Sequence, residues 1–143
     1  MSKPLEINLT LPCLSEFVAI IRLMVSGIAT RMNFTIEEIE DIKIAVSEAC
    51  TNSVQYAYKD KKDGKLNVVC HIIDNKLDII IKDSGKGFNL QQVEQNKKDN
   101  VNPNKFGLGL GFTFMKSLMD EVSVETDPEK GTTIHLVKYS KNQ

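Results

Sequence analysis

The sequence predicts an α+β fold in a single domain. Apolar residues alternate with polar ones in several short segments, a period of two that is typical of half-buried strands. Other segments repeat apolar residues at helical spacing and are long enough for amphipathic helices. The chain has 143 residues, a length that fits one domain with a sizeable core, so we expect residues 1–143 to form one unit.

The composition is that of an ordinary globular protein, with 41% hydrophobic and 26% charged residues. The net charge of -1 gives no general attraction to nucleic acid or to anionic membranes. No apolar run is long enough to cross a bilayer, and the N-terminal segment lacks the apolar core of a signal peptide. We therefore expect a cytoplasmic protein with no direct nucleic-acid partner and no membrane partner.

The cysteines and histidines do not predict a metal site. Cys13, Cys50 and Cys70 are odd in number, widely spaced and surrounded by apolar residues, which favours reduced core thiols over a disulfide framework or a zinc site. His71 and His135 fall in strand-like segments with no paired ligand nearby in the sequence, and we interpret both as structural.

The first half of the chain predicts one strand followed by two helices. Residues 5–11 alternate apolar and polar side chains and end at Pro12, as expected for a half-buried strand. Apolar residues at helical spacing predict a helix over residues 15–32. A longer helix begins at the capping box of Thr35 and Glu38, whose side chains satisfy free amides at a helix start, and runs to about residue 58.

The second half predicts two hairpins separated by a long connection and a helix. Alternating segments predict strands over residues 66–72 and 77–83, with a turn at 74–75. The segment at about residues 89–106 is polar and contains proline, which is typical of a functional lid. A helix follows from about residue 107, and the last two strands flank a turn at residues 127–131.

Glu48 and Asn52 are the first candidate site residues. They lie one helical turn apart on the same face of the second helix. The carboxylate can accept a proton, and the amide oxygen can help to hold a hard cation. Both lie off the main apolar stripe, so they face either water or a cleft. Taken alone, such a pair is most often part of a solvated helix surface.

Asp83 is the second candidate. The pleat of its strand points its carboxylate in the same direction as three apolar side chains of that strand. A carboxylate at the buried end of a strand needs a hydrogen-bond partner, which a ligand can provide. Gly85 and Gly87 follow directly, and taken alone they are equally typical of a β-turn.

A second glycine cluster, Gly107, Gly109 and Gly111, precedes the predicted helix after the lid. Free amides at the positive end of a helix dipole form an anion site that suits phosphate. The glycine spacing does not match a Rossmann fingerprint, and the chain has no Gly-Lys-Ser/Thr ending of a Walker loop. In isolation the cluster is also compatible with a flexible hinge.

The order of these motifs is more specific than any one of them. Along the chain come Glu-x-x-x-Asn on a helix, Asp-x-Gly-x-Gly after a strand, a polar lid, a glycine cluster opening a helix, and Gly-Thr-Thr opening a strand at residues 131–133. This set resembles the ATP-binding fold shared by gyrase, Hsp90, histidine kinases and MutL, the Bergerat-type fold. Within it the chain is similar to the anti-sigma-factor serine kinases, most of all their stress-response branch. Residues 22–32, 38–52 and 118–122 carry this resemblance, which covers nearly the whole chain.

The resemblance implies a two-layer α+β sandwich. In this family a mixed, mainly antiparallel sheet is covered on one face by helices, and ATP binds between the layers. Asp83 is then implied to accept a hydrogen bond from the adenine amino group, and Thr132 to help at the adenine. Gly85 and Gly87 are implied to let the backbone pass close to the base.

The same resemblance implies residues for the phosphates and for a magnesium ion. Gly107, Gly109 and Gly111 would cover the phosphates with backbone amides, and Lys105 would add a positive charge. Asn52 would bind the Mg²⁺ that bridges the phosphates.

The function implied by the resemblance is that of an anti-sigma factor which is also an ATP-dependent protein serine/threonine kinase. Glu48 would be the general base for a serine or threonine hydroxyl on a small anti-anti-sigma protein. The second partner would be a sigma factor, with Arg22 near the partner surface. Family members of this kind are usually homodimers, and the strand at residues 5–11 is a candidate edge for pairing between subunits.

Two alternatives remain. The ATP-binding domain of a histidine kinase would need a phosphoacceptor histidine on a separate dimerisation helix, and neither His71 nor His135 lies in a predicted helix. The other alternative is a non-catalytic, ATP-dependent anti-sigma or regulatory binding module. The presence of Glu48 argues against it.

Overall fold

The computed structural model describes residues 3–57, 64–85 and 110–141. The lid expected at about residues 89–106 lies outside the described residues, and so do Gly87, Lys105, Gly107 and Gly109.

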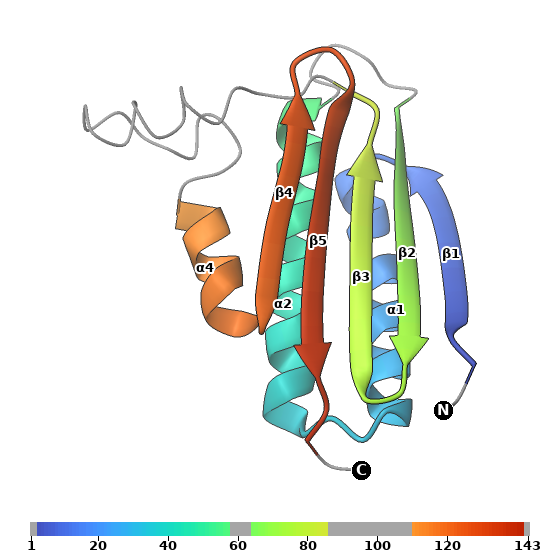
Figure 1. Ribbon diagram of the computed structural model, residues 1–143. Helices are drawn as coiled ribbons and strands as arrows, with labels where there is room; N and C mark the ends of the chain where they lie inside the picture. Colours follow the sequence, from blue (N-terminus) through green and yellow to red (C-terminus); the bar gives the residue numbers. More distant parts are fainter. Residues whose placement is uncertain (1–2, 58–63, 86–109, 142–143) are drawn as a thin grey trace.

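The described chain folds into a layer of helices and a layer of strands (Figure 1). The strands are β1 (Leu5–Pro12), β2 (Lys65–Ile73), β3 (Lys76–Asp83), β4 (Glu121–Asp127) and β5 (Gly131–Tyr139). The helices are α1 (Val18–Arg31), α2 (Ile36–Asn52) and α4 (Leu110–Leu118). A short 3-10 turn, η1 (Ser15–Phe17), precedes α1, and a π-helical turn, η2 (Ser53–Ala57), continues α2.

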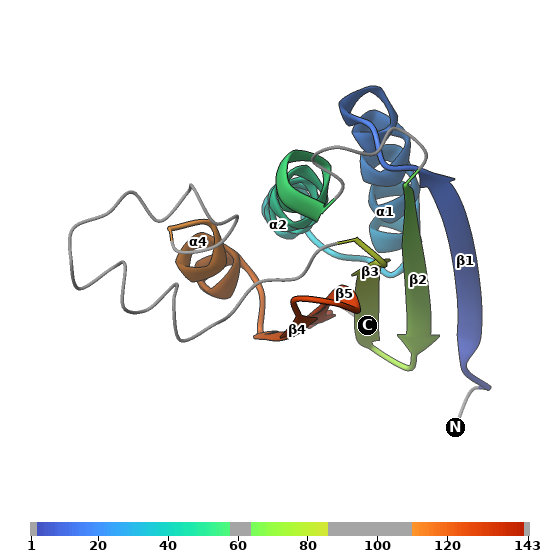
Figure 2. The same cartoon turned by 90° about the horizontal axis from the view of Figure 1, so that it is seen from above.

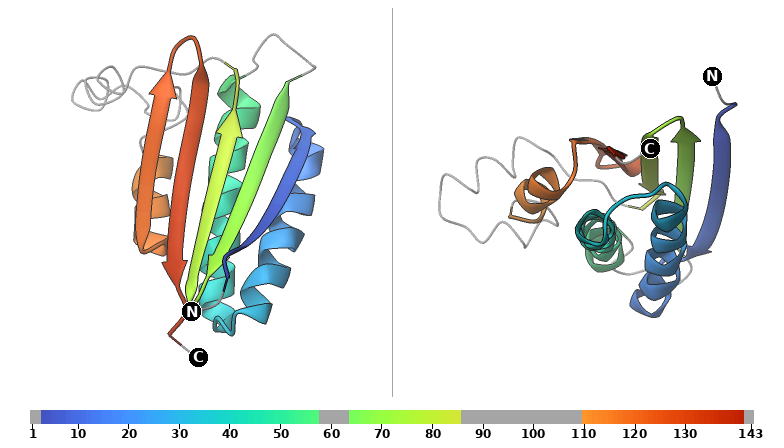
Figure 3. Two further views of the ribbon diagram at one scale, coloured as in Figure 1. Left: turned by 45° about the vertical axis from the view of Figure 1, so that its right-hand side comes forward. Right: turned by 90° about the horizontal axis from the view of Figure 1, so that it is seen from below.

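The sheet has the strand order β1-β2-β3-β5-β4, and every pairing between described strands is antiparallel. All three described helices lie on one face of it, with α2 between α1 and α4 (Figures 2 and 3). The predicted two-layer α+β sandwich with a mainly antiparallel sheet is therefore confirmed. No parallel pair occurs among the described strands, so the sheet is simpler than the mixed sheet that the resemblance implied.

The core forms where the helix-facing side chains of the sheet meet the inner faces of α1 and α2. Every second side chain of β2 is buried, as period-two alternation predicts. Ile21 and Val25 of α1 and Ile42 and Val46 of α2 are almost completely buried against this surface. Burying an aliphatic side chain of this size stabilises the fold by about 1.5–3 kcal/mol, so the core fixes α2 firmly over the sheet.

The predicted start of α2 is confirmed. The backbone N–H of Glu38 donates to Thr35 Oγ1 at 3.1 Å, and the N–H of Thr35 donates to Glu38 Oε1 at 2.8 Å. This capping box satisfies two amides that the helix itself leaves without partners. The hairpin turn between β2 and β3 is confirmed as well, with Asp74 in the left-handed region at φ 52.

The first strand differs from its prediction as a half-buried strand. Leu5 and Ile7 are 46% and 37% exposed, and within β1 only Leu11 is buried. The register pairs Leu5 with Ile72 and Ile7 with Cys70, so both side chains share the helix-facing side of the sheet. They are exposed because β1 is an edge strand with a neighbour on one side only.

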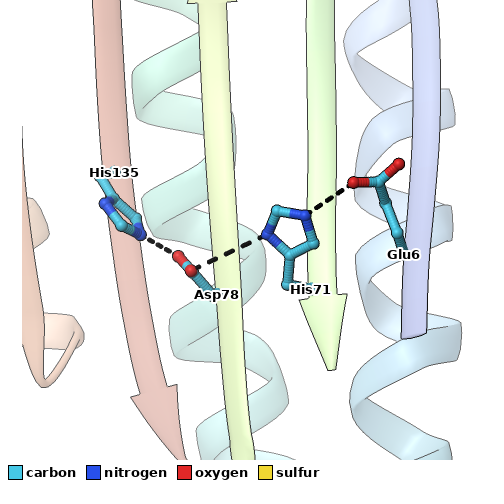
Figure 4. A network of polar contacts seen from close by, with 4 residues as sticks. All are labelled: Glu6, His71, Asp78 and His135. Atoms are coloured by element: carbon cyan, nitrogen blue, oxygen red, sulfur yellow. Dashed lines mark hydrogen bonds and ion pairs between the residues drawn. The ribbon is translucent and has the colours of Figure 1, made fainter. Parts of the chain in front are cut away.

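The two histidines lie on the opposite face of the sheet, in β2 and β5, as strand residues (Figure 4). His71 Nε2 is 2.8 Å from Glu6 Oε1, and His71 Nδ1 is 4.0 Å from Asp78 Oδ2. Asp78 Oδ1 also contacts His135 Nε2. These partners come from β1 and β3, which the sequence spacing did not reveal. The contacts tie four strands together and fit a structural role. Among the described residues, no group of three or more His, Cys, Asp or Glu side chains is placed to hold a metal ion.

The cysteines are free and buried, as predicted. Burial raises the pKa of Cys13 to about 11 and the pKa of Cys50 and of Cys70 to about 12. Thiols with such pKa values carry almost no thiolate at neutral pH, so they pack as small apolar groups. None of the described helices has the length and apolar character that a membrane span requires.

Candidate active site

Candidate residues from several elements meet at one end of the two layers, uppermost in Figure 1. This end combines the last turn of α2, the turn η2, the end of β3 and the start of β5. The first turn of α4 reaches the same region from the side of α2. Candidate residues that are far apart in the sequence therefore lie towards the same end of the two layers.

Asp83 is the most buried charged group of the site, with 3% of its surface exposed. The hydroxyl of Ser53 donates to its Oδ2 at 2.8 Å. The backbone N–H groups of Gly85 and Thr132 donate to its Oδ1 at 3.2 and 3.3 Å. The side chain that strand parity predicted to face the apolar layer does so, and the protein itself supplies these three donors.

The carboxylate of Asp83 has capacity for one more donor. Each carboxylate oxygen offers two lone pairs, so the two backbone amides fill Oδ1 while the Ser53 hydroxyl leaves one lone pair on Oδ2. Burial raises the pKa of Asp83, and the three hydrogen bonds counteract only part of this effect. A further N–H donor, such as the amino group of a purine, would therefore be favourable at Oδ2.

Gly85 lies against the backbone of η2. A Cβ atom at Gly85 would be 2.2 Å from the carbonyl oxygen of Ala57 and 2.5 Å from its carbonyl carbon. Such distances do not occur for real Cβ atoms, so only glycine fits here. The close approach seen in the structure is thus between two parts of the protein, whereas the expected approach of Gly85 to a base stays a prediction.

Thr132 lies opposite Asp83 in the β3–β5 ladder and is buried. Its hydroxyl oxygen is 2.9 Å from the hydroxyl oxygen of Thr126 on β4. The preceding Gly131 has φ +104, and a Cβ there would be 2.3 Å from the carbonyl oxygen of Asp83. The Gly-Thr pair therefore brings β5 close to the end of β3 and places Thr132 beside Asp83, while the expected role of Thr132 at the adenine stays a prediction.

Glu48 faces α4 rather than open water. A Cβ atom at Gly111, in the first turn of α4, would be 2.4 Å from Glu48 Oε1. The carboxylate is partly buried between the two helices. The sequence left open whether Glu48 faces solvent or a cleft, and the structure places it at the boundary between α2 and α4.

Asn52, one turn further along α2, has a buried Nδ2 that finds no hydrogen-bond partner in the described part of the chain. An unsatisfied buried donor costs about 1–3 kcal/mol, so a ligand that accepts this hydrogen bond would bind favourably. A phosphate oxygen fits Nδ2, and the oxygen of the same amide suits Mg²⁺. Magnesium is commonly held by one or two protein oxygens together with phosphates and water, and the role of Asn52 as its ligand stays a prediction.

A pocket of about 270 Å³ opens beside Asp83, between the end of β3 and the β4–β5 hairpin. Asp83, Thr126 and Thr132 line it together with Lys82 and Lys130. Glu48, Asn52 and Gly111 are not among its lining residues. The described residues thus form two parts of a site, one around Asp83 and one where α2 meets α4.

Arg22 lies elsewhere, exposed on α1. Two functional contacts were missed by sequence reasoning, the hydroxyls of Ser53 and Thr126. The turn at residues 127–131 does predict that Thr126 and Thr132 are neighbours in a hairpin. No comparable signal exists for Ser53, because its position depends on the π-helical turn.

The family model described as the histidine kinase-like ATPase domain matches residues 11–138. The serine-protein kinase RsbW of Bacillus subtilis is 42% identical over 138 residues, which cover 93% of this chain and 84% of that protein. The serine-protein kinase RsbW of Staphylococcus aureus is 40% identical over 148 residues, which cover 99% and 91%. The chain belongs to the RsbW family of histidine kinase-like ATPases.

Solved structures agree on the fold. A crystal structure of the RsbU and RsbW domains of a Mycobacterium tuberculosis protein has a TM-score of 0.67 at 20% identity, covering 97% of this chain and 33% of that longer one. The nucleotide-free catalytic domain of the histidine kinase ThkA has a TM-score of 0.57 at 14% identity, covering 97% of each chain. At these identities the likeness concerns the fold alone.

Family membership confirms the resemblance to the anti-sigma-factor serine kinases and the prediction of an ATP-dependent protein serine kinase. It also argues against the histidine-kinase alternative, since these relatives are named serine-protein kinases and both histidines lie in strands. ATP is accordingly the nucleotide that the site must accommodate.

Proposed function

We propose that the protein is an anti-sigma factor which binds and inhibits a sigma factor and phosphorylates a serine on an anti-anti-sigma antagonist. Phosphorylation of the antagonist would decide which partner is held, in a stress-response switch. The observation that carries the catalytic part is the placement of Glu48 and Asn52 on one wall of α2, at the same end of the molecule as the buried Asp83. This placement supports the proposed roles of Glu48 as base, Asn52 as metal ligand and Asp83 as purine anchor.

Glu48 is the proposed general base. Its carboxylate takes the proton of the antagonist's seryl hydroxyl, the seryl oxygen bonds to the γ-phosphorus of ATP, and the bond between that phosphorus and the β–γ bridging oxygen breaks to release ADP. Most of the acceleration in such transfers comes from positioning and from charge stabilisation, so the orientation of Glu48 matters as much as its basicity.

The nucleotide is held from both parts of the site. The free lone pair on Asp83 Oδ2 accepts the adenine amino group, and Thr132 contributes beside it. Asn52 would hold Mg²⁺ through its amide oxygen, and the ion would neutralise charge on the phosphates. The phosphate-binding segment consists of Gly111 together with Gly107, Gly109 and Lys105, which lie outside the described residues. Gly85 and Gly87 lie near the adenine base in this proposal.

We propose a cytoplasmic homodimer of single-domain chains, residues 1–143, with the lid at about residues 89–106. Edge strand β1 supports this dimer through the exposed Leu5 and Ile7. The exposed Arg22 on α1 supports a partner surface on that helix.

An assay with labelled ATP, magnesium and a purified anti-anti-sigma protein as the phosphate acceptor tests this proposal. Glu48→Ala should lower transfer to the antagonist's serine by about 100-fold or more, because the base is lost, while ATP still binds. Asn52→Ala should instead weaken magnesium-dependent ATP binding. Phosphotransfer and nucleotide affinity, measured on the same preparations, separate the two roles.

The non-catalytic binding module is the competing proposal. This proposal predicts tight binding to the sigma factor and no transfer of labelled phosphate to the antagonist. That result would contradict the kinase mechanism. Undiminished transfer by Glu48→Ala would show that the base is another group. Unchanged magnesium dependence in Asn52→Ala would contradict its role as a metal ligand.

A further inference from the structure

Gly111 contacts Glu48 in a way that phosphate binding does not explain. The three atoms that a Cβ at Gly111 would meet are Glu48 Oε1 at 2.4 Å, Cδ at 3.3 Å and Cγ at 3.4 Å. All three belong to one side chain, and none belongs to a backbone. The side-chain position of Gly111 is therefore directed at the carboxylate of Glu48, whereas a phosphate would be bound by backbone N–H groups.

The two helices that carry this contact are fixed in place. Met115 of α4 and Met119, which directly follows this helix, are 0% and 6% exposed and belong to the main core. Ala45 and Ala49, which flank Glu48 on α2, are completely buried. Neither helix can move away without opening the core, so space between Glu48 and α4 is set by the side chains at the contact.

We propose that Gly111 is a positioning residue for the catalytic base: its missing side chain leaves the space in which the Glu48 carboxylate is held. This inference rests on the proposed role of Glu48. A methyl group at position 111 displaces the carboxylate into another rotamer. The displaced group is the far end of a flexible side chain, so the fold adapts easily while the base loses its position.

The effect on catalysis should exceed the effect on stability. A displacement of about 1 Å in a catalytic group can lower the rate about 100-fold. Gly111→Ala should therefore lower kcat for transfer by about 10- to 100-fold, with little change in the Kd for ATP or in the melting temperature. Gly27→Ala is the matched control, because Gly27 is also a helical glycine and a Cβ there meets nothing within 4 Å.

A double-mutant cycle tests whether Gly111 acts through Glu48. Glu48→Asp keeps the carboxylate but withdraws it by one methylene, which vacates space for a methyl group at position 111. Glu48→Asp alone should lower kcat, and adding Gly111→Ala to it should cause little further loss. Two groups that act on one another give such non-additive losses, whereas independent residues give losses that multiply.

The outcomes separate this inference from the proposed function. Transfer that survives in Glu48→Ala would overturn the proposed base itself. Loss of transfer in Glu48→Ala combined with full kcat in Gly111→Ala would overturn only the positioning role. Multiplying losses in the double variant, or a weaker Kd for ATP with unchanged kcat in Gly111→Ala, would also overturn it and would assign Gly111 to the phosphates alone.

Discussion

At the scale of one residue, Asp83 combines a proposed contact with ATP and a cost to folding stability. Its carboxylate is buried, its pKa is raised by that burial, and three donors hold it in one orientation. A folded-state pKa above the unfolded value means that the folded chain binds more protons. The contribution of Asp83 to stability therefore decreases as the pH rises above about 3.9, the ordinary value for aspartate.

Asp83→Asn should separate binding from stability. The amide oxygen can accept both backbone N–H groups and its NH₂ can donate to Ser53, but no lone pair is left for an adenine amino group. ATP affinity should decrease by about 10- to 100-fold, the range for a hydrogen bond to a charged group. Isothermal titration calorimetry measures this change.

The same variant should be at least as stable as the wild type at pH 7, and its advantage should shrink as the pH falls towards 4. Thermal unfolding at several pH values measures this difference. Asp41→Asn on α2 is the control for removal of a charge. A variant that loses stability at pH 7 but keeps its ATP affinity would contradict the assignment.

Sequence reasoning succeeds for Asp83 because strand parity fixes the direction of a side chain. It fails for Ser53, since periodicity predicts which face of a regular helix a residue occupies but not where the helix widens. The contact of Glu48 with Gly111 could not be predicted from the sequence either, because this contact depends on how α2 and α4 pack together. Residue types and motif order indicated the site, and tertiary packing determines its internal contacts.

The turn η2 continues α2 and packs against the end of β3. A π-helical turn holds one more residue per hydrogen-bonded turn than an α-helix, and such turns are frequent at functional sites. Here it directs the Ser53 hydroxyl to Asp83 and brings the Ala57 backbone against Gly85. The helix predicted to about residue 58 is helical as far as Ala57, the last described residue of this segment, but the prediction did not include the change of helix type after Asn52.

Gly85→Ala should destabilise the fold, in contrast to Gly111→Ala. Its Cβ would meet backbone atoms of Ala57, which cannot rotate away. Overpacking of this kind costs about 1–3 kcal/mol, so the midpoint of urea unfolding should fall, and ATP binding should weaken with it as η2 shifts.

Gly27→Ala provides the control, because alanine is favoured over glycine within a helix and that variant should not lose stability. A Gly85→Ala variant with an unchanged unfolding midpoint would show that η2 and the end of β3 are less tightly packed than described.

Among the described strands, β1 and β4 form the two edges of the sheet. Edge strands with exposed apolar side chains favour pairing with another chain, and β1 carries two such residues, Leu5 and Ile7. The alternation at residues 5–11 predicted the strand correctly. It did not predict the exposure, because sequence pattern alone does not reveal that a strand lies at an edge.

Ile7→Lys should convert the proposed homodimer into monomers, since a charged side chain on an edge strand opposes pairing. Sedimentation velocity measures the change in mass. Ile36→Lys is the control, because Ile36 is 81% exposed at the start of α2 and away from β1. A dimer that persists in Ile7→Lys, or a wild-type protein that is already monomeric, would exclude β1 as the interface.

The position of β5 between β3 and β4 has a consequence for the order in which the protein gains its activity. Ser53 reaches Asp83 across 30 residues of chain, but the Thr132 amide reaches it across 49, from the described strand that the ribosome makes last. A nascent chain that stops before Gly131 contains Glu48, Asn52 and Asp83 but has no strand to join β3 to β4. Its carboxylate lacks one of three donors, and its β4 lacks a partner. A chain that ends before Gly131 would therefore lack part of the proposed adenine site, so we expect ATP binding to require that β5 has been made.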